Sequence, residues 1–201
     1  MDFKNGAELL ALCREHGCSV SEIMRIREQE SGDAAPEEIQ ARMERILEIM
    51  KESASSPVRS PRKSIGGLIG GEARLLDAHR AAGKSICGDV ISRAITYACG
   101  VLEVNTSMGL IVAAPTAGSS GVVPGVLLAL GDVYQIPDSR LIDGLFNAGA
   151  IGYLAMRNAT VAGAVGGCQA EVGVAAAMAG SPPTELMGGE PGGWLGAASF
   201  V

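Results

Sequence analysis

Cys168 is the residue whose neighbours most strongly suggest chemistry. It lies in Asn158-Ala-Thr-Val-Ala-Gly-Ala-Val-Gly-Gly-Cys168-Gln-Ala-Glu-Val-Gly173, a run of small residues in which Glu171 is the one charged side chain. Glycine has no Cβ, so it lets backbone or a bulky inorganic group approach closely. A soft thiolate in such a pocket is the type of ligand that iron–sulfur clusters use. The segment therefore predicts that Cys168 is a cluster ligand in a glycine-lined pocket rather than a core residue.

A second stretch with possible chemistry is Ala114-Pro-Thr-Ala-Gly-Ser-Ser-Gly121, which offers hydroxyl and backbone N–H groups at an expected helix start. Such groups suit a carboxylate or a phosphate. A plain Gly/Ser connector explains the stretch equally well. A similar polar cluster, residues 103–109, lies just upstream in the same uncharged region. Because buried hydroxyls and amides need partners, two such clusters favour a buried polar site.

The remaining thiols predict no further metal site. Cys13 and Cys18 flank a histidine, but no second ligand pair follows at the spacing of a zinc site, so we interpret them as part of a helix end. Cys87 and Cys99 are interpreted as small core residues. The five cysteines include no CxxC pair, and no signal peptide precedes them. We therefore expect free thiols in the reducing cytoplasm.

The distribution of charged residues and glycines divides the sequence into three regions. Residues 1–63 carry 22 of the 38 charged side chains, whereas residues 64–201 carry 25 of the 28 glycines. We predict a charged, amphipathic helical region over 1–52, a linker over 53–64 that contains Pro57 and Pro61, and an apolar core domain rich in Gly and Ala over 65–201, in which the candidate site residues lie.

Apolar spacing predicts a mainly α fold in which the larger domain resembles a helical bundle. In the N-terminal region we expect a helix ending at His16-Gly17, a second capped by Ser19 or Ser21, and a third starting at Pro36. Residues 66–71 are expected to form a loop. Strict strand alternation is hard to find. Further helices are expected over 72–82, 89–99, 122–134, 138–158 and 169–179.

Net charge and composition limit the possible partners. The formal charge of −6 and the 3% aromatic content give nucleic acid no electrostatic or stacking reason to bind. The 28 residues between Glu103 and Asp132 carry no charge, which raises a membrane interpretation. Polar residues and prolines divide that run into pieces shorter than the roughly 20 residues of a spanning helix. We therefore expect no membrane association, although discontinuous helices of transporters leave this alternative open.

Four segments together resemble the iron–sulfur-dependent L-serine dehydratases, in particular the α chain of the two-chain bacterial type. They are Glu103-Val-Asn-Thr-Ser-Met-Gly109, Val112-Ala-Ala-Pro-Thr-Ala-Gly-Ser119, Gly125-Val-Leu-Leu-Ala-Leu130 and Gly166-Gly-Cys-Gln-Ala-Glu-Val-Gly173, in the family's order. The N-terminal helices and Gly66-Gly-Leu-Ile-Gly-Gly71 also resemble that chain. The resemblance covers nearly the whole sequence, and the four motifs are jointly specific.

The resemblance implies a [4Fe–4S] cluster held by three cysteines, with one iron left open for substrate. Cys168 aligns with the first of these ligands. The family's other two lie in a segment resembling Cys-Asp-Pro-Val-Ala-Gly followed by Val-Pro-Cys, and neither occurs here. The chain follows the family to Leu186-Met-Gly-Gly-Glu-Pro191 and then departs from it. We therefore expect a truncated or frameshifted α chain that does not hold a stable cluster and is inactive alone.

The implied reaction converts L-serine to pyruvate and ammonia, with the open iron acting as a Lewis acid on the departing hydroxyl group. We expect the polar loops to hold the amino and carboxylate groups of the substrate through Asn105, Ser107, Thr116 and Ser119. The sequence does not identify the catalytic base: Glu171 is a candidate, and a structural role explains it equally well. The implied partner is a separate β chain. Two alternatives remain, a membrane-embedded component and a non-catalytic binding subunit.

Overall fold

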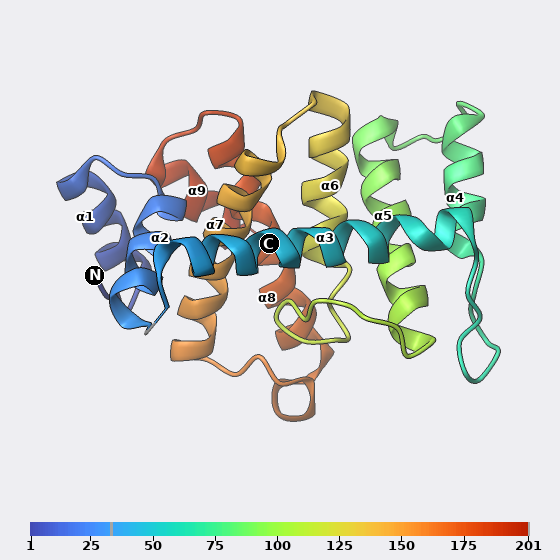
Figure 1. Cartoon of the computed structure of the whole chain (residues 1–201), viewed down its shortest axis with the longest axis horizontal. Helices are drawn as coiled ribbons and strands as arrows, with labels where there is room; N and C mark the ends of the chain where they lie inside the picture. Colours follow the sequence, from blue (N-terminus) through green and yellow to red (C-terminus); the bar gives the residue numbers. More distant parts are fainter. Residues whose placement is uncertain (33, 201) are drawn as a thin grey trace. The chain divides into compact units, whose positions relative to one another are not determined.

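The computed structural model describes residues 1–32 and 34–200, which form nine α-helices and contain no β-strand (Figure 1). The prediction of a mainly α fold is confirmed. The helices are α1 (Gly6–His16), α2 (Val20–Ser31), α3 (Pro36–Arg59), α4 (Glu72–Ala81), α5 (Gly88–Thr106), α6 (Val122–Tyr134), α7 (Asp138–Asn158), α8 (Gly163–Leu186) and α9 (Pro191–Ser199).

The predicted signals at the ends of the first three helices are confirmed. Gly17 ends α1 with a φ of 64°, a left-handed conformation that glycine adopts without steric cost. Ser19 caps α2, and its side chain and that of Glu22 form a reciprocal capping box. Pro36 is the first residue of α3, where its missing N–H group costs no helical hydrogen bond. Short-range chemistry therefore determines where α1 ends and where α2 and α3 begin.

α3 continues further than the sequence predicts. It runs to Arg59, so residues 53–59 of the expected linker are helical and contain Pro57 within the helix. Pro57 is almost completely buried, and the adjoining Ser53 and Ala54 are buried too. Burial of this face offsets the hydrogen bond that the proline removes. Residues 53–59 are therefore helical rather than irregular, although the sequence suggested a break at the proline.

The chain forms two compact units, residues 1–45 with 138–201 and residues 46–137. In the first unit, α7 packs against α2 and α8, and α8 packs against α9. In the second unit, α5 packs against α4 and α6 (Figure 1). The three regions 1–52, 53–64 and 65–201 were predicted from composition, and that division into domains stays a prediction.

Glycines allow close helix packing within the second unit. A Cβ atom on Gly100 of α5 would lie 2.3 Å from the carbonyl oxygen of Ala54 in α3. A Cβ atom on Gly125 of α6 would lie 2.8 Å from the carbonyl oxygen of Ala94 in α5. Both distances are too short for a side chain, so these helices meet through their backbones, as the Gly/Ala-rich composition predicts.

In the first unit, the N-terminal segment fixes the end of α7, where the Cys168 segment begins. Arg157 and the Tyr153 hydroxyl each donate to the Asp2 carboxylate at 2.9 Å. These bonds, with one from Arg27, hold the pKa of the Asp2 carboxyl well below its usual range. The Asn158 side chain donates to the carbonyl oxygen of Lys4 at 2.8 Å. The start of the glycine-rich segment is thus attached to the N-terminus of the chain.

Two predicted helices are longer than expected, and α9 is additional. α5 extends to Thr106 rather than ending at Cys99, and α8 spans residues 163–186 rather than 169–179. α8 is interrupted at Gly167, whose φ of 76° and ψ of 175° are not helical. Within the described part of the chain, no helix combines the length and apolar character needed to cross a bilayer.

Candidate active site

The loop between α5 and α6 brings three of the four predicted substrate-binding residues together. The Asn105 side-chain amide, near the end of α5, donates to the carbonyl oxygen of Ala117 at 2.9 Å. The hydroxyl groups of Thr116 and Ser119 lie 3.2 Å apart. Ser119 also donates to the carbonyl oxygen of Ala114 at 3.3 Å and is almost fully buried. The two polar clusters of the sequence therefore form one connected structure.

Ser107 has a more local role than the other three. It is the C-terminal capping residue of α5, and its hydroxyl donates to the carbonyl oxygen of Val104 at 3.0 Å. Asn105, in contrast, uses only its amide N–H₂ group in its bond to the loop. Its side-chain oxygen accepts no hydrogen bond from the described residues, and the side chain is half-buried. That oxygen remains available to a hydrogen-bond donor on a ligand.

The packing of α6 against α5 places this loop. A Cβ atom on Gly121, the residue before α6, would lie 2.6 Å from the carbonyl oxygen of Ala98 in α5. The start of α6 lies directly against α5, so a residue larger than glycine does not fit at position 121. No side chain caps this end of α6. Backbone N–H groups at the start of a helix favour anionic ligands.

Glu103 is a buried acidic residue whose role the sequence reasoning missed. Its side chain is 2% exposed, and its carboxylate accepts hydrogen bonds from the backbone N–H groups of Ala73 at 2.8 Å and Arg62 at 3.5 Å. Ala73 lies in the first turn of α4, so Glu103 satisfies a free N–H group of that helix. Burial and the negative charge of Glu103 raise the pKa of the Cys99 thiol. Glu103 therefore attaches the residues on both sides of the predicted loop at 66–71 to α5.

Cys168 lies in the other unit, directly after the interruption of α8 at Gly167. The side chain is exposed, as are the neighbouring residues 164–167 and 169. The predicted pocket around the thiol is therefore open rather than enclosed. The break at Gly167 requires glycine because its φ is positive. It places Cys168 at the start of a new helical stretch.

Glu171 lies one turn after Cys168 on the same helix and reaches back across the break. A Cβ atom on Gly163 would lie 2.5 Å from Oε2 of Glu171. The carboxylate therefore lies against the backbone of Gly163, in the helical turn before the break. Cys168 and Glu171 belong to one unit, whereas Asn105, Thr116 and Ser119 belong to the other.

A buried network around Glu185 was also missed. The Glu185 carboxylate accepts hydrogen bonds from the hydroxyl and backbone N–H groups of Ser21 and from the side-chain amide of Asn147. All three residues are buried. Burial, together with the negative charge of Glu185, raises the pKa of the nearby Cys13 thiol to about 11. No short-range signal reveals this network, because Ser21 and Glu185 are 164 positions apart.

The described residues do not complete a ligand set for a metal or cluster. No three His, Cys, Asp or Glu side chains among them come together in a way that could hold a metal ion. Of the five free thiols, Cys13 is buried, Cys18 and Cys99 are half-buried, and Cys87 and Cys168 are exposed. The exposure of Cys87 corrects its interpretation as a core residue: it lies in the turn before α5, which no helix covers. Cys168 is thus a single candidate ligand.

Comparison with known proteins identifies the family. The family model described as "Serine dehydratase alpha chain" matches residues 15–201. The chain belongs to this family. It is 39% identical over 189 residues to a protein of Bacillus subtilis (strain 168) named "Probable L-serine dehydratase, alpha chain". That match covers 94% of this chain and 63% of the relative.

Two further relatives extend the comparison. The "L-serine dehydratase, alpha chain" of Peptoniphilus asaccharolyticus is 36% identical to this chain over 194 residues. The match covers 96% of this chain and 66% of the relative. The "L-serine dehydratase" of Helicobacter pylori (strain ATCC 700392 / 26695) is 37% identical over 186 residues, covering 89% and 40%. The chain thus spans less than two thirds of the length of these relatives.

Proposed function

We propose that this protein is the α chain of an L-serine dehydratase, which converts L-serine to pyruvate and ammonia together with a separate β chain. The main support is the family match over residues 15–201. Two relatives carry "L-serine dehydratase, alpha chain" in their names. Because the chain spans only part of each relative, activity, substrate and partner are all parts of the proposal. The five free cysteines favour a reducing cytoplasm.

The loop between α5 and α6 is the proposed substrate site. The free side-chain oxygen of Asn105 is suited to accept a hydrogen bond from the ammonium group of serine. The Thr116 and Ser119 hydroxyl groups bond to each other and Ser119 bonds to the Ala114 carbonyl oxygen, so they shape the loop, while the positive end of the α6 dipole is suited to attract the substrate carboxylate. Ser107 is proposed to support this arrangement by capping α5. Fixing both ends of the substrate orients the Cα–H and Cβ–OH bonds that must break.

The proposed reaction requires a base for the Cα proton. Removing that proton and losing the hydroxyl group as water leaves aminoacrylate, whose hydrolysis gives pyruvate and ammonia. Glu171 remains the candidate base, because it is a carboxylate one turn from Cys168. Its position over Gly163 is equally consistent with a structural role.

We propose that Cys168 contributes one thiolate to a [4Fe–4S] cluster. Its exposure and its place at a helix start suit a metal ligand. The described residues alone do not fit a complete cluster, since they bring no second and third ligand to Cys168.

A chimeric enzyme tests the proposed function. The 189 matching residues of this chain would replace their counterparts in the Bacillus subtilis relative, with its β chain coexpressed under anaerobic conditions. We expect the chimera to release pyruvate from L-serine. The Asn105→Ala variant should raise KM at least tenfold, because the substrate loses one contact and the loop loses its bond to Ala117. A folded chimera that binds the β chain but forms no pyruvate would instead identify a non-catalytic binding subunit.

A further inference from the structure

Arg62, in the segment that joins α3 to α4, carries a guanidinium group that forms no ion pair with the described residues. The side chain is exposed, and the hydrogen bond from Arg62 to Glu103 is donated by its backbone N–H group. Arg59, three residues earlier, pairs with the Glu52 carboxylate at 3.0 Å. The guanidinium group of Arg62 is therefore free to bind an anion, and its position indicates which one.

That guanidinium group lies against the turn that follows α5. Backbone hydrogen bonds from Met108 to Asn105 at 3.0 Å and from Gly109 to Val104 at 2.8 Å fold this turn back onto the end of the helix. A Cβ atom on Gly109 would lie 3.0 Å from Nη1 of Arg62. The cation is therefore next to the turn that contains Asn105, whose free side-chain oxygen is the proposed acceptor for the substrate ammonium group.

Backbone contacts fix the segment that carries Arg62. The buried Glu103 carboxylate accepts from the N–H groups of Arg62 at 3.5 Å and Ala73 at 2.8 Å. The N–H group of Ile65 donates to the carbonyl oxygen of Thr106 at 3.2 Å. Figure 1 shows this segment at the same end of α5 as the loop that leads to α6. Because the backbone of Arg62 is held in place, binding a ligand orders little besides its side chain.

The carboxylates close to Arg62 in the fold already have other partners. Glu103 accepts from two backbone N–H groups, and Glu72 accepts from the N–H group of Gly70 at 2.7 Å. A guanidinium group presents a planar fork of donors that matches a carboxylate. A free cation for a carboxylate beside an amide oxygen for an ammonium group, here from Asn105, is the combination that an α-amino acid zwitterion requires.

We propose that Arg62 binds the carboxylate of L-serine while the side-chain oxygen of Asn105 accepts from its ammonium group. This inference rests on the proposed function, which supplies the substrate. It adds the residue that selects α-amino acids over amines without a carboxylate. The α6 dipole contributes a partial positive charge to the same site, whereas Arg62 contributes a full one. Glu103 is a positioning residue, since it contacts the backbone of Arg62 rather than the substrate.

Two inhibitors that differ only at the carboxylate test this assignment in the chimera. L-Alanine keeps the ammonium and carboxylate groups of serine, whereas L-alaninamide has a neutral amide in place of the carboxylate. Arg62→Gln should raise KM for L-serine and weaken inhibition by L-alanine, each by about tenfold or more. Inhibition by L-alaninamide and the iron content should stay unchanged. Arg62→Lys should have an intermediate effect, because lysine keeps the charge but lacks the planar fork.

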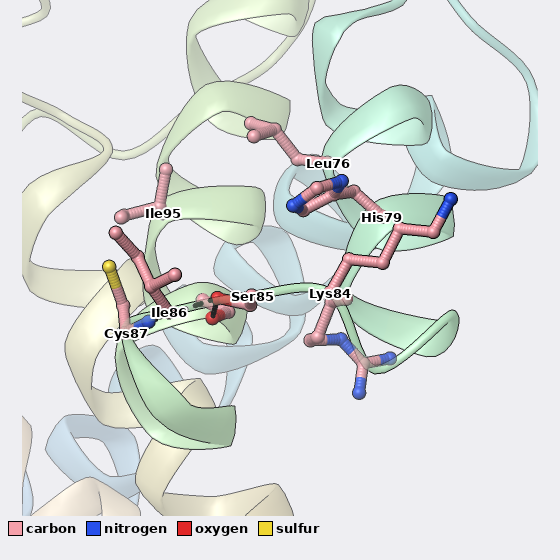
Figure 2. Close-up of a pocket in the computed structure, with 9 residues that line it drawn as sticks. Leu76, His79, Lys84, Ser85, Ile86, Cys87 and Ile95 are labelled. Atoms are coloured by element: carbon pink, nitrogen blue, oxygen red, sulfur yellow. Dashed lines mark hydrogen bonds between the residues drawn. The ribbon is translucent and has the colours of Figure 1, made fainter.

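Lys84→Gln is the matched control. Lys84 is also an exposed cation that forms no ion pair with the described residues, and it lines a pocket of about 310 Å³ (Figure 2). This pocket lies beside the start of α5, at the other end of the helix from the Asn105 turn. Lys84→Gln should leave KM and inhibition by both compounds unchanged.

The two inhibitors also separate carboxylate binding from a structural role of Arg62. Equal weakening of both inhibitors in Arg62→Gln would overturn the assignment, as would undiminished inhibition by L-alanine. Calorimetry of L-alanine binding needs no turnover, so it distinguishes this assignment from the proposed reaction. Binding that depends on Arg62 in a chimera that forms no pyruvate would contradict the reaction alone. A folded chimera that does not bind L-alanine would overturn the assignment of Arg62.

Discussion

Two cysteines of the first unit have opposite surroundings, and these determine their chemistry. Cys168 is exposed after a break in α8, where a thiolate is accessible to a metal. Cys13 is buried near the Glu185 carboxylate, and both burial and that charge raise the pKa of its thiol to about 11. A neutral buried thiol is a poor ligand and a poor nucleophile. Of these two, Cys168 is therefore the one suited to bind iron.

The Cys13 thiol predicts how stability depends on alkaline pH. Its pKa is about 11 in the folded chain and near 9.0 when unfolded. Between these values the unfolded chain loses the proton first, so the free energy of unfolding falls as pH rises from 9 to 11. The loss should reach about 2 kcal/mol.

Urea unfolding at several pH values measures this effect. Cys13→Ala should have a lower stability at pH 7 but a shallower decline above pH 9. Part of the decline should remain, because burial also raises the pKa values of Tyr97 and Cys99. Equal slopes in the wild-type chain and the variant would show that the Cys13 thiol does not cause the decline.

At the scale of the helix, close packing predicts opposite effects for two glycine substitutions. Gly100→Ala would place a Cβ atom 2.3 Å from the Ala54 carbonyl oxygen, so α3 or α5 must shift. We expect the free energy of unfolding to fall by about 1–3 kcal/mol. Gly149→Ala in α7 is the control, because nothing lies within 4 Å of its added Cβ.

The control should gain about 0.5–1 kcal/mol, since alanine is the better helix former. Urea unfolding measures both variants. A neutral or stabilising effect of Gly100→Ala would mean that α3 and α5 do not approach each other through their backbones.

Some helix ends follow from local sequence signals, whereas others depend on contacts between distant parts of the chain. Gly17, Ser19 and Pro36 act on their immediate neighbours, so the end of α1 and the starts of α2 and α3 follow from local chemistry. The end of α3 does not, because Pro57 usually terminates a helix and only its burial in the folded chain compensates. The end of α5 was missed for a related reason: Glu103 bonds to Arg62 and Ala73, which are distant in sequence.

The candidate site shows the same limit. The polar types and spacing of residues 105–119 predict a polar site, and the structure connects Asn105 with the 114–119 loop. The Glu185 network was not predictable, because its members come from α2, α7 and α8 and meet only in the folded unit. Cys87 was misassigned because a small thiol is usually buried, and nothing in its local sequence reveals that the turn before α5 is exposed.

At the scale of the whole molecule, the account predicts that this chain alone does not retain a cluster. Its five cysteines include one exposed thiol at the proposed cluster position, and no three ligand-type side chains meet in the described part. After anaerobic reconstitution and desalting, the isolated chain should hold far less than four iron atoms. Four iron and four sulfide per chain would show that its own residues complete the ligand set.

The most direct test is to measure the iron and acid-labile sulfide bound to the chimera. It asks whether Cys168 is a cluster ligand of an L-serine dehydratase. The chimera should hold a cluster, and Cys168→Ala should lose most of the iron and sulfide together with pyruvate formation. Cys18→Ala is the matched control, because that half-buried thiol donates to the His16 carbonyl oxygen in the turn after α1, and it should retain both. A Cys168→Ala chimera with undiminished iron, sulfide and pyruvate formation would contradict the account.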